Sequence, residues 1–313
     1  MAGIDKLDKR INVLAPEKKS AMNIKVKINQ ISRRIKRLMH NYLQKLIRYD
    51  GFADDQFTIS SKTTKCDYER LAQQCQKQTF PVVDNWEKEM GFCISKVWLD
   101  ELALVTQITI KESELNYQHG RVIYSTLRNY IQERLRKKNS PKIKILEIGT
   151  ARGFSAICMS KAILDAHIDA NIISIDPLPH NRQMYWNCIA DIEGKSSRKD
   201  LLRGYQKELE NILFVQGHSP DSLNKLGIDR INFAFVDGMH KYPNILEEYK
   251  FIKKHQVVGD IILFDDIQSA EYSDVGELAK NIEKTGEYSL QEIWSNENRG
   301  YGVMRKTGTE EKS

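Results

Sequence analysis

The stretch Ile145-Leu146-Glu147-Ile148-Gly149-Thr150-Ala151-Arg152-Gly153-Phe154-Ser155 decides the fold. Its apolar start predicts a buried strand, and Gly149 and Gly153 predict a tight turn that lets the backbone approach a ligand closely. The amide groups that begin the following helix would face that ligand. The G-x-G-x-x-G dinucleotide pattern is not met, because Ala151 stands where its second glycine would be. We expect a nucleotide-type ligand at this turn; a glycine turn without a ligand is the alternative.

The chain after Pro141 alternates short apolar runs with helical stretches. Strands separated in this way need crossover helices, which produces a mostly parallel sheet covered on both faces. We therefore expect an α/β fold: a Rossmann-like, doubly wound, mostly parallel sheet with an antiparallel last hairpin, preceded by a helical N-terminal region. The predicted strands are 143–148, 172–175, 212–215, 231–236, 261–264, 288–294 and 300–305.

The pattern along the chain predicts five regions. Residues 50–78 within the third region are polar and rich in turn residues, which indicates a linker or irregular structure, whereas 82–104 and 122–135 have helical spacing. The five regions are a mobile leader (1–22), a basic amphipathic helix (23–48), a mostly helical cap region (49–140), the Rossmann-like domain (141–306) and a disordered tail (307–313).

The segment 18–48 concentrates the positive charge of the chain. It holds ten Lys or Arg residues and no acid, whereas the whole protein carries only +6. Its apolar residues, from Ile24 to Tyr42, recur in steps of four and three and form one narrow helical stripe. Three interpretations remain open: a coiled-coil or partner-docking helix that makes a homo-oligomer, a helix packed on its own chain, and a helix that binds an anionic membrane surface or nucleic acid.

Composition and cysteine usage restrict the class of protein. With 313 residues, 41% hydrophobic and 29% charged, the chain has the profile of one large or two modest globular domains. Its five cysteines are an odd number without a C-x-x-C pair, which indicates a reducing compartment. We find no signal peptide and no apolar run long enough to span a membrane. We expect a cytoplasmic protein, with peripheral attachment to an anionic membrane surface left open by the basic segment.

Acidic residues follow the predicted strands at the edge where doubly wound sheets bind ligands. Asp176 ends the second strand, where a carboxylate can accept ribose hydroxyl protons, although a helix cap is the commoner role of a lone Asp. Asp237, Asp265 and Asp266 end the fourth and fifth strands. Three carboxylates at one edge are costly without a cation, and oxygen ligands favour Mg²⁺, or Mn²⁺ or Ca²⁺, over Zn²⁺. Helix caps and solvated loop acids are the alternative.

Two motifs carry a resemblance to a known family. The glycine spacing 149/153 after Glu147 resembles the S-adenosylmethionine loop of class I methyltransferases. V-D-G-x-H-x-Y at 236–242, followed by G-D-I-I-x-F-D-D at 259–266, resembles the metal-dependent small-molecule O-methyltransferases, the group related to macrocin and other sugar O-methyltransferases. The resemblance covers about residues 115–305 and leaves 1–90 outside it.

The resemblance implies roles for individual residues. Asp237, Asp265 and Asp266 would hold a divalent metal, with magnesium as the expected ion, and His240 would be the base where relatives have a lysine. The residues implied in binding S-adenosylmethionine are Glu147, Gly149, Thr150, Ala151, Gly153, Ser155, Asp176, Gly217, His218, Ser219, Asp237 and His119. Ser219 could equally be the N-cap of a helix, and His119 could equally belong to a loop and helix start.

The segment 177–188 is longer and more aromatic than a crossover requires. It would form a substrate lid, or Tyr185 and Trp186 would simply pack in the interior. The implied activity is methyl transfer to a hydroxyl of a sugar, other small polyol or phenol. The rival hypotheses are a cephalosporin-hydroxylase-like enzyme on the same scaffold and a membrane- or nucleic-acid-associated binding protein that uses its basic helix. Nucleic acid is disfavoured, because no N-P-P-Y or P-C pair of a base methyltransferase is present.

Overall fold

A computed structural model describes residues 63–111, 114–137, 142–267, 273–296 and 299–308, together with Met39. Apart from Met39, all of these belong to one compact unit, Thr58–Ser313. The predicted leader 1–22 and, Met39 aside, the basic helix 23–48 lie outside the described residues, as do 49–62 of the cap region and 309–313 of the tail. Thr307, the first residue of the predicted tail, donates its amide to the carbonyl oxygen of Glu287 at 2.9 Å.

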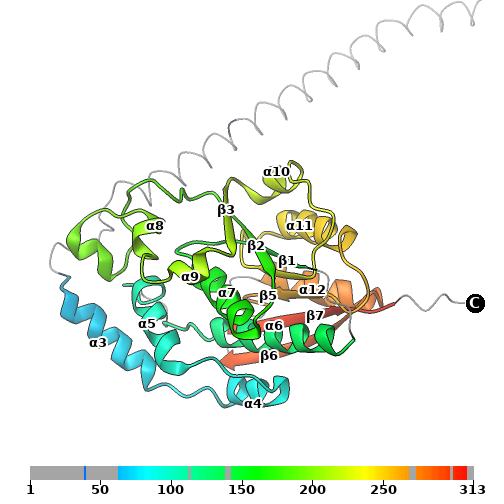
Figure 1. Ribbon diagram of the computed structural model, residues 1–313, viewed down its shortest axis with the longest axis horizontal. Coiled ribbons are helices and arrows are strands. Elements are labelled where there is room, and N and C mark those ends of the chain that lie inside the picture. The colour runs from blue at the N-terminus through cyan, green and yellow to red at the C-terminus, as the bar shows by residue number, and fades with distance from the viewer. Residues whose placement is uncertain are drawn as a thin grey trace, which may run out of the picture. The chain divides into compact units, whose positions relative to one another are not determined.

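The centre of this unit is a seven-stranded sheet with the order β3-β2-β1-β4-β5-β7-β6 (Figure 1). The first five strands are parallel, and β7 pairs antiparallel with both β5 and β6. This confirms the predicted α/β fold with its antiparallel last hairpin. The strands are β1 Ile143–Ile148, β2 Ala170–Asp176, β3 Ile212–Gln216, β4 Phe233–Val236, β5 Ile261–Phe264, β6 Tyr288–Asn296 and β7 Arg299–Lys306.

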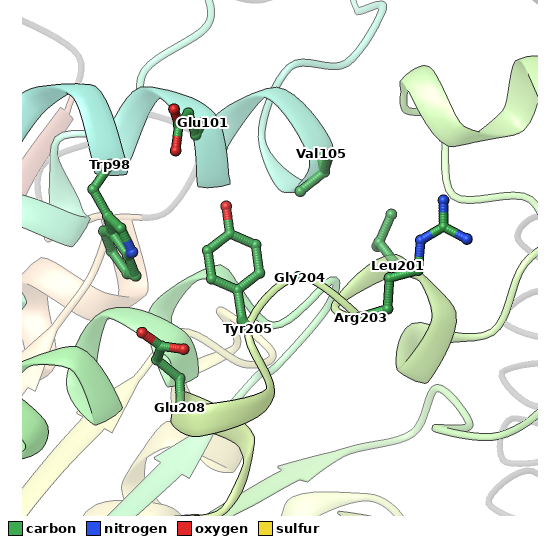
Figure 2. A pocket seen from close by; sticks show the side chains of 8 residues that line it. All are labelled: Trp98, Glu101, Val105, Leu201, Arg203, Gly204, Tyr205 and Glu208. Atoms are coloured by element: carbon green, nitrogen blue, oxygen red, sulfur yellow. The ribbon is translucent and has the colours of Figure 1, made fainter.

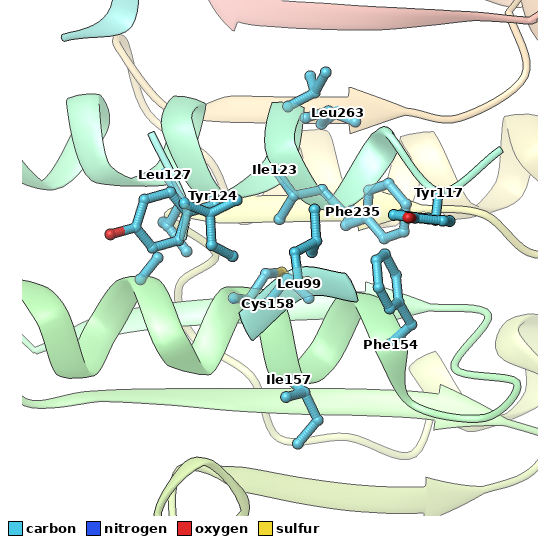
Figure 3. Close-up of a cluster of buried hydrophobic side chains, with 14 of the residues drawn as sticks. Leu99, Tyr117, Ile123, Tyr124, Leu127, Phe154, Ile157, Cys158, Phe235 and Leu263 are labelled. Carbon is cyan, nitrogen blue, oxygen red and sulfur yellow. The ribbon is translucent and has the colours of Figure 1, made fainter. Parts of the chain in front are cut away.

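Alternate residues of the central strands enter two separate hydrophobic cores. Ile145 and Phe235 face the core shared with α6 and α7, whereas Leu146 and Val236 face the core shared with α10, α11 and α12. Figure 3 shows the first core, in which α6 and α7 cover Phe235 and Leu263. The helices are α6 His119–Arg136, α7 Phe154–Ala166, α10 Ser219–Leu223, α11 Tyr242–Lys254 and α12 Ser273–Lys284. Both faces of the sheet are thus covered, as near-continuous apolar strands require.

The cap region differs from the prediction in two places. The polar segment expected to be irregular contains α3, Lys65–Gln76, which begins with a reciprocal capping box between Thr64 and Asp67. The predicted helix 82–104 is two helices, α4 Pro81–Met90 and α5 Lys96–Thr106. Gly91 ends α4 in the left-handed conformation at φ 77°, and Ser95 begins α5 by accepting the Trp98 amide. In both places, local capping interactions decide the helix boundaries more strongly than composition and periodicity do.

The insertion between β2 and β3 folds as a packed substructure of short helices. These are the 3₁₀ helix η1 Ile189–Glu193, α8 Arg198–Leu201 and α9 Gln206–Leu209. Trp186 has no exposed surface, and its indole N–H donates to the Ser196 carbonyl oxygen at 2.8 Å. The Trp186 carbonyl oxygen in turn accepts Arg152 Nε at 2.5 Å. The structure therefore favours interior packing for Trp186 over a role at the surface of a lid.

Two further predictions concern compartment and membrane. All five cysteines are free, which agrees with the absence of a disulfide framework in the sequence. Within the part of the chain that the structure describes, no helix combines the length and the apolar surface that crossing a bilayer requires.

Candidate active site

The β1–α7 turn has the geometry that its glycines predict. Gly149 and Gly153 have φ values of 93° and 96°, in the left-handed region that favours glycine. A Cβ on Gly149 would lie 1.9 Å from the carbonyl oxygen of Asp237, and one on Gly153 would lie 2.7 Å from Leu202 Cδ1. The turn is closed by the Gly153 amide, which donates to the Thr150 carbonyl oxygen at 2.8 Å. The β1–α7 turn therefore lies in close contact with Asp237, the residue that follows β4.

Glu147 lies beneath this turn, not on its surface. It has no exposed area, and its carboxylate accepts the Ser155 hydroxyl at 2.5 Å and the Ser174 hydroxyl on its other oxygen. Thr150 joins the same network through its hydroxyl, 2.5 Å from that of Ser174. Burial raises the pKa of Glu147 to about 7, although the two serine hydroxyls oppose the shift. Glu147 thus braces β1, β2 and α7 from below, and its expected contact with a ligand remains a prediction.

Asp176 ties the end of β2 to the turn. Its carboxylate accepts the amides of Ala151 at 2.9 Å and Leu178 at 2.6 Å, and Arg198 approaches to 3.4 Å. Arg198 is only 2% exposed, and its Nε donates to the Ala151 carbonyl oxygen at 2.8 Å. Arg198 is not among the predicted site residues. Its place in a polar insertion gave no sign that it would be buried against Asp176 and the β1–α7 turn.

The end of β3 and the start of α6 hold the next predicted residues. His218 precedes α10, so Ser219 is the first helical residue and not the N-cap that was the alternative interpretation. The Ser219 hydroxyl instead donates to Glu248 of α11, and the Gly217 amide donates to the Asp176 carbonyl oxygen at 2.9 Å. His119 begins α6 and is 3% exposed, with its ring 4.8 Å from that of Phe154. Burial lowers the pKa of His119 to about 3, so this imidazole is neutral.

A cluster of possible metal ligands lies at the ends of β4 and β5. One ligand atom from each of Asp237, His240 and Asp266 can be chosen so that all three lie within 4.8 Å of one another. His240 Nε2 is 3.3 Å from Asp237 Oδ1, and the two side chains are 15% and 30% exposed. Asp266 has a φ of 56°, which an aspartate tolerates better than most residues. The structure thus brings two of the three predicted carboxylates together and adds the imidazole.

Asp265, the third predicted carboxylate, is not part of this group. Its side chain has no exposed surface and pairs with Arg299, whose Nη2 lies 2.7 Å from Oδ2, while Oδ1 accepts the Asp266 amide at 2.9 Å. Burial raises the pKa of Asp265, but the Arg299 guanidinium more than offsets it, so the pKa lies below its ordinary value. Asp265 is therefore already neutralised by a cation of its own chain.

Arg299, like Arg198, is a residue that sequence reasoning missed. It is the first residue of β7, and because β7 runs antiparallel to β5, its beginning lies beside the end of β5. Arg299 Nε also lies 3.5 Å from Asp266 Oδ1. The sequence did contain a signal for this residue. Arg299 directly precedes the predicted antiparallel strand 300–305, and such a strand begins beside the strand ends that carry the acids.

The negative charge of the aspartates at the ends of β4 and β5 exceeds the positive charge of Arg299. Burial, followed by the charge of Asp265, raises the pKa of Asp237 to about 6 and that of Asp266 to about 7. Burial lowers the pKa of His240, but the hydrogen bond and charge of Asp237 and the charges of Asp266 and Asp265 outweigh it, so the net pKa is raised. A carboxylate cluster of this kind favours a bound cation.

A separate depression of about 480 Å³ lies between α5 and the segment 201–208. Figure 2 shows Trp98 and Tyr205 on one side of it and Leu201 and Arg203 on the other. None of the predicted site residues lines it. It is therefore distinct from the cluster at the ends of β4 and β5.

Comparison with known proteins finds a family model and solved structures that are similar to part of this chain. Residues 146–267 match a family model described as a methyltransferase domain. The O-methyltransferase TomG from Streptomyces achromogenes, in complex with SAM, is 16% identical with a TM-score of 0.48, over 69% of this chain and 92% of that chain. An O-methyltransferase from Bacillus cereus in complex with SAH is 12% identical with a TM-score of 0.46, over 77% and 100%. The O-methyltransferase NovP is 16% identical with a TM-score of 0.47, over 69% and 100%. No curated protein sequence matches the chain.

The family match identifies residues 146–267 as a methyltransferase domain, and this domain lies within the Rossmann-like sheet described above. S-adenosylmethionine as the methyl donor remains a prediction. The identities with the solved structures are too low to transfer an acceptor or a site residue from them.

Proposed function

We propose that the protein methylates a hydroxyl group of a sugar, another small polyol or a phenol, with S-adenosylmethionine as donor and a divalent metal as an aid. The observation that carries this proposal is the contact between the β1–α7 turn, where the methyl donor would bind, and Asp237 of the possible metal site. The Asp237 amide donates to the Ile148 carbonyl oxygen at 2.8 Å. The carbonyl oxygen of Asp237 lies where the side chain of any residue other than glycine at position 149 would begin. A methyl donor held at the turn would thus adjoin an acceptor held at Asp237 and Asp266.

The residues present fit a divalent ion. Asp237 and Asp266 would supply carboxylate oxygens, and the spacing of these side chains around His240 allows one ion to be shared. Bound there, such an ion would lower the pKa of an acceptor hydroxyl as a Lewis acid. Carboxylate oxygens favour Mg²⁺, or Mn²⁺, at such a site. Asp265 would not bind the ion itself. Its ion pair with Arg299 would hold the backbone before Asp266 in place.

His240 would take the proton of the acceptor hydroxyl. Its ring is held by Asp237 and is partly exposed, which suits a group that must reach a substrate. The protein's main contribution to the reaction would be to hold the two reactants in line. If His240 is instead a metal ligand, His240→Asn will weaken metal affinity; if it is the base, metal affinity will remain while the acidic limb of the pH profile of kcat is lost.

The test is production of S-adenosylhomocysteine with a panel of small hydroxyl acceptors, with and without a chelator. We expect chelation, Asp237→Asn and Asp266→Asn each to lower turnover by at least about 100-fold, a magnitude typical for loss of a catalytic group. Asparagine is chosen at 266 because it tolerates the left-handed backbone. Asp221→Asn, an exposed acid on α10, is the matched control and should retain activity. Undiminished turnover after chelation and in both variants would remove the metal from the proposal, and consumption of an oxidant without S-adenosylhomocysteine would favour the hydroxylase-like hypothesis.

A further inference from the structure

Helix α11 carries a carboxylate at a position where its other inward-facing residues are apolar. Ile245, Tyr249 and Ile252 pack in the core that α10, α11 and α12 share with the sheet, and Glu248 lies in the same helical row. Glu248 has no exposed surface, and burial raises its pKa to about 7. An apolar side chain would fill this place at a lower cost, because burying a carboxylate removes its hydration. Packing of the core alone therefore does not account for a glutamate here.

The Glu248 carboxylate joins two loops that follow strands of the sheet. Its Oε1 accepts the hydroxyl of Ser219, the first residue of α10, and Figure 1 shows α10 and α11 next to each other. The same oxygen lies beneath Gly238, the second residue after β4. A Cβ on Gly238 would be 3.6 Å from this oxygen and 2.9 Å from Ile148 Cγ2 at the end of β1. Glu248 thus connects the loop after β3 with the loop after β4.

The bond to Ser219 is the one hydrogen bond of this carboxylate within the described part of the chain. Glu248 Oε2 is buried and has no hydrogen-bond partner among the same residues. The segment 217–219 is otherwise held through its backbone: the Gly217 amide donates to the Asp176 carbonyl oxygen, and the His218 carbonyl oxygen accepts the Ser222 amide, both at 2.9 Å. The Glu248 contact therefore adds a side-chain link between this segment and α11.

We propose that Glu248 is a positioning residue for the methyl donor, because it holds the Ser219 hydroxyl and thereby fixes the segment 217–219 for donor binding. The inference rests on the proposed function, in which S-adenosylmethionine binds at this edge of the sheet. Glu248 would not touch the donor, since its side chain is fully buried. On the opposite face of the sheet, Glu147 has a similar arrangement, with its buried carboxylate bound to the Ser155 and Ser174 hydroxyls.

Two substitutions of similar size separate the hydrogen bond from the packing. Methionine at position 248 fills the space but offers Ser219 no strong acceptor, whereas glutamine keeps an acceptor oxygen and buries an amide without a partner. We expect Glu248→Met to keep or raise the melting temperature, because replacing a buried charge by an apolar group is often neutral or stabilising. The same variant should bind S-adenosylhomocysteine at least about tenfold more weakly.

Glu248→Gln should give the opposite result. Its affinity for S-adenosylhomocysteine should stay within about twofold of the wild type, while its unpartnered amide lowers the melting temperature. A merely structural role would not produce this crossed pattern, because affinity would then follow stability. Glu247→Met, the exposed neighbour on the same helix, is the matched control and should change neither quantity. Calorimetric titration and thermal unfolding of the full-length protein measure both. Wild-type affinity in Glu248→Met, or equal losses of affinity in the two variants, would overturn the proposal.

A double substitution tests whether Glu248 acts through Ser219. Ser219→Ala removes the same hydrogen bond from the other side and should also weaken S-adenosylhomocysteine binding at least about tenfold. Adding Glu248→Met to Ser219→Ala should then weaken binding by less than about twofold, because the contact is already absent. Additive losses would mean that Glu248 acts on the donor by another route, which contradicts the proposal.

Failure of the proposed function is distinguishable from failure of this inference. If the wild type does not bind S-adenosylhomocysteine, the proposed donor site is refuted and the role of Glu248 with it; if the wild type and Glu248→Met bind equally well, only the role of Glu248 is refuted. Should Glu248→Met not fold, a crystal of the wild type with S-adenosylhomocysteine decides. Contact between 217–219 and the ligand, with Ser219 still bound to Glu248, supports the proposal. Absence of that contact, or a Ser219 hydroxyl turned away from Glu248, refutes it.

Discussion

Arg299 supplies the countercharge for an acid that solvent does not reach. Asp265 is fully buried, and Arg299 is itself only 21% exposed, so the pair is largely shielded from water. Removing one member of a buried pair leaves the other charge desolvated and unpaired, which is far more costly than losing a surface pair.

We therefore expect Arg299→Met to lower the free energy of unfolding by about 3–5 kcal/mol. The matched control is Arg305→Met on the same strand, which removes a more exposed pair with Glu133 and should cost about 0–1 kcal/mol. Urea unfolding of both variants measures the difference. Similar losses in the two would mean that the Asp265 pair contributes no more than a surface ion pair.

Glu147 makes stability depend on pH in a defined direction. Its pKa is about 7 in the folded protein against an ordinary value of 4.5, so the folded state holds a proton that the unfolded state releases. The stabilisation from this group is complete below about pH 4.5 and is lost as the pH rises through about 7, in total about 3 kcal/mol.

Glu147→Gln should remove this dependence. Measured by urea unfolding, the stability of the variant relative to the wild type should rise by up to about 3 kcal/mol between pH 4.5 and pH 8. Glu193→Gln, an exposed position in η1, should follow the wild type at every pH. If the two variants show parallel pH profiles, the Glu147 carboxyl group is not protonated in the folded state.

Among the connecting elements, the β1–α7 turn is where local conformation and tertiary contact coincide. Gly149 needs a positive φ and also lies against Asp237, whereas Gly91, at the end of α4, has a φ of 77° and open space where a side chain would begin: a Cβ there would meet nothing within 4 Å. Substitutions at these two positions therefore distinguish the cost of backbone strain from the cost of steric overlap.

Gly91→Ala should cost about 1 kcal/mol of stability through its left-handed backbone and leave affinity for S-adenosylhomocysteine within about twofold. Gly149→Ala must displace the turn or the end of β4, and we expect at least a tenfold, or about 1.4 kcal/mol, loss of that affinity. Calorimetric titration of both variants checks this. Unaltered affinity in Gly149→Ala would show that the turn can move without affecting the donor site.

At the scale of the whole molecule, the two hydrophobic cores are built from residues 68–304, so the described unit contains its own means of folding. Deleting residues 1–57 should therefore change the melting temperature by less than about 3 °C, the equivalent of about 1 kcal/mol in a domain of this size. The same deletion tests one of the three open interpretations of the basic segment 23–48, that it makes a homo-oligomer. Light scattering should then report a smaller assembly than for the full chain, and an identical mass would contradict that role.

Local sequence was sufficient for the sheet, the conformation of the β1–α7 turn and the acids that end β4 and β5. Strand periodicity, glycine spacing and the convergence of parallel strand ends are properties of short segments or of simple topology. The start of α3 was within reach too, because its capping box is a local signal that can be read from Thr64 and Asp67 alone.

The pairings of Asp265 with Arg299, Asp176 with Arg198, and Glu147 with Ser174 were not predictable in the same way. Each joins residues that are distant in sequence, and each depends on which side chain is buried against which charge. The sequence therefore located the acids at one edge of the sheet. Three-dimensional packing assigned Asp265 to a cation of the chain and left Asp237, His240 and Asp266 facing one another, because only burial and side-chain proximity determine which charges are already compensated.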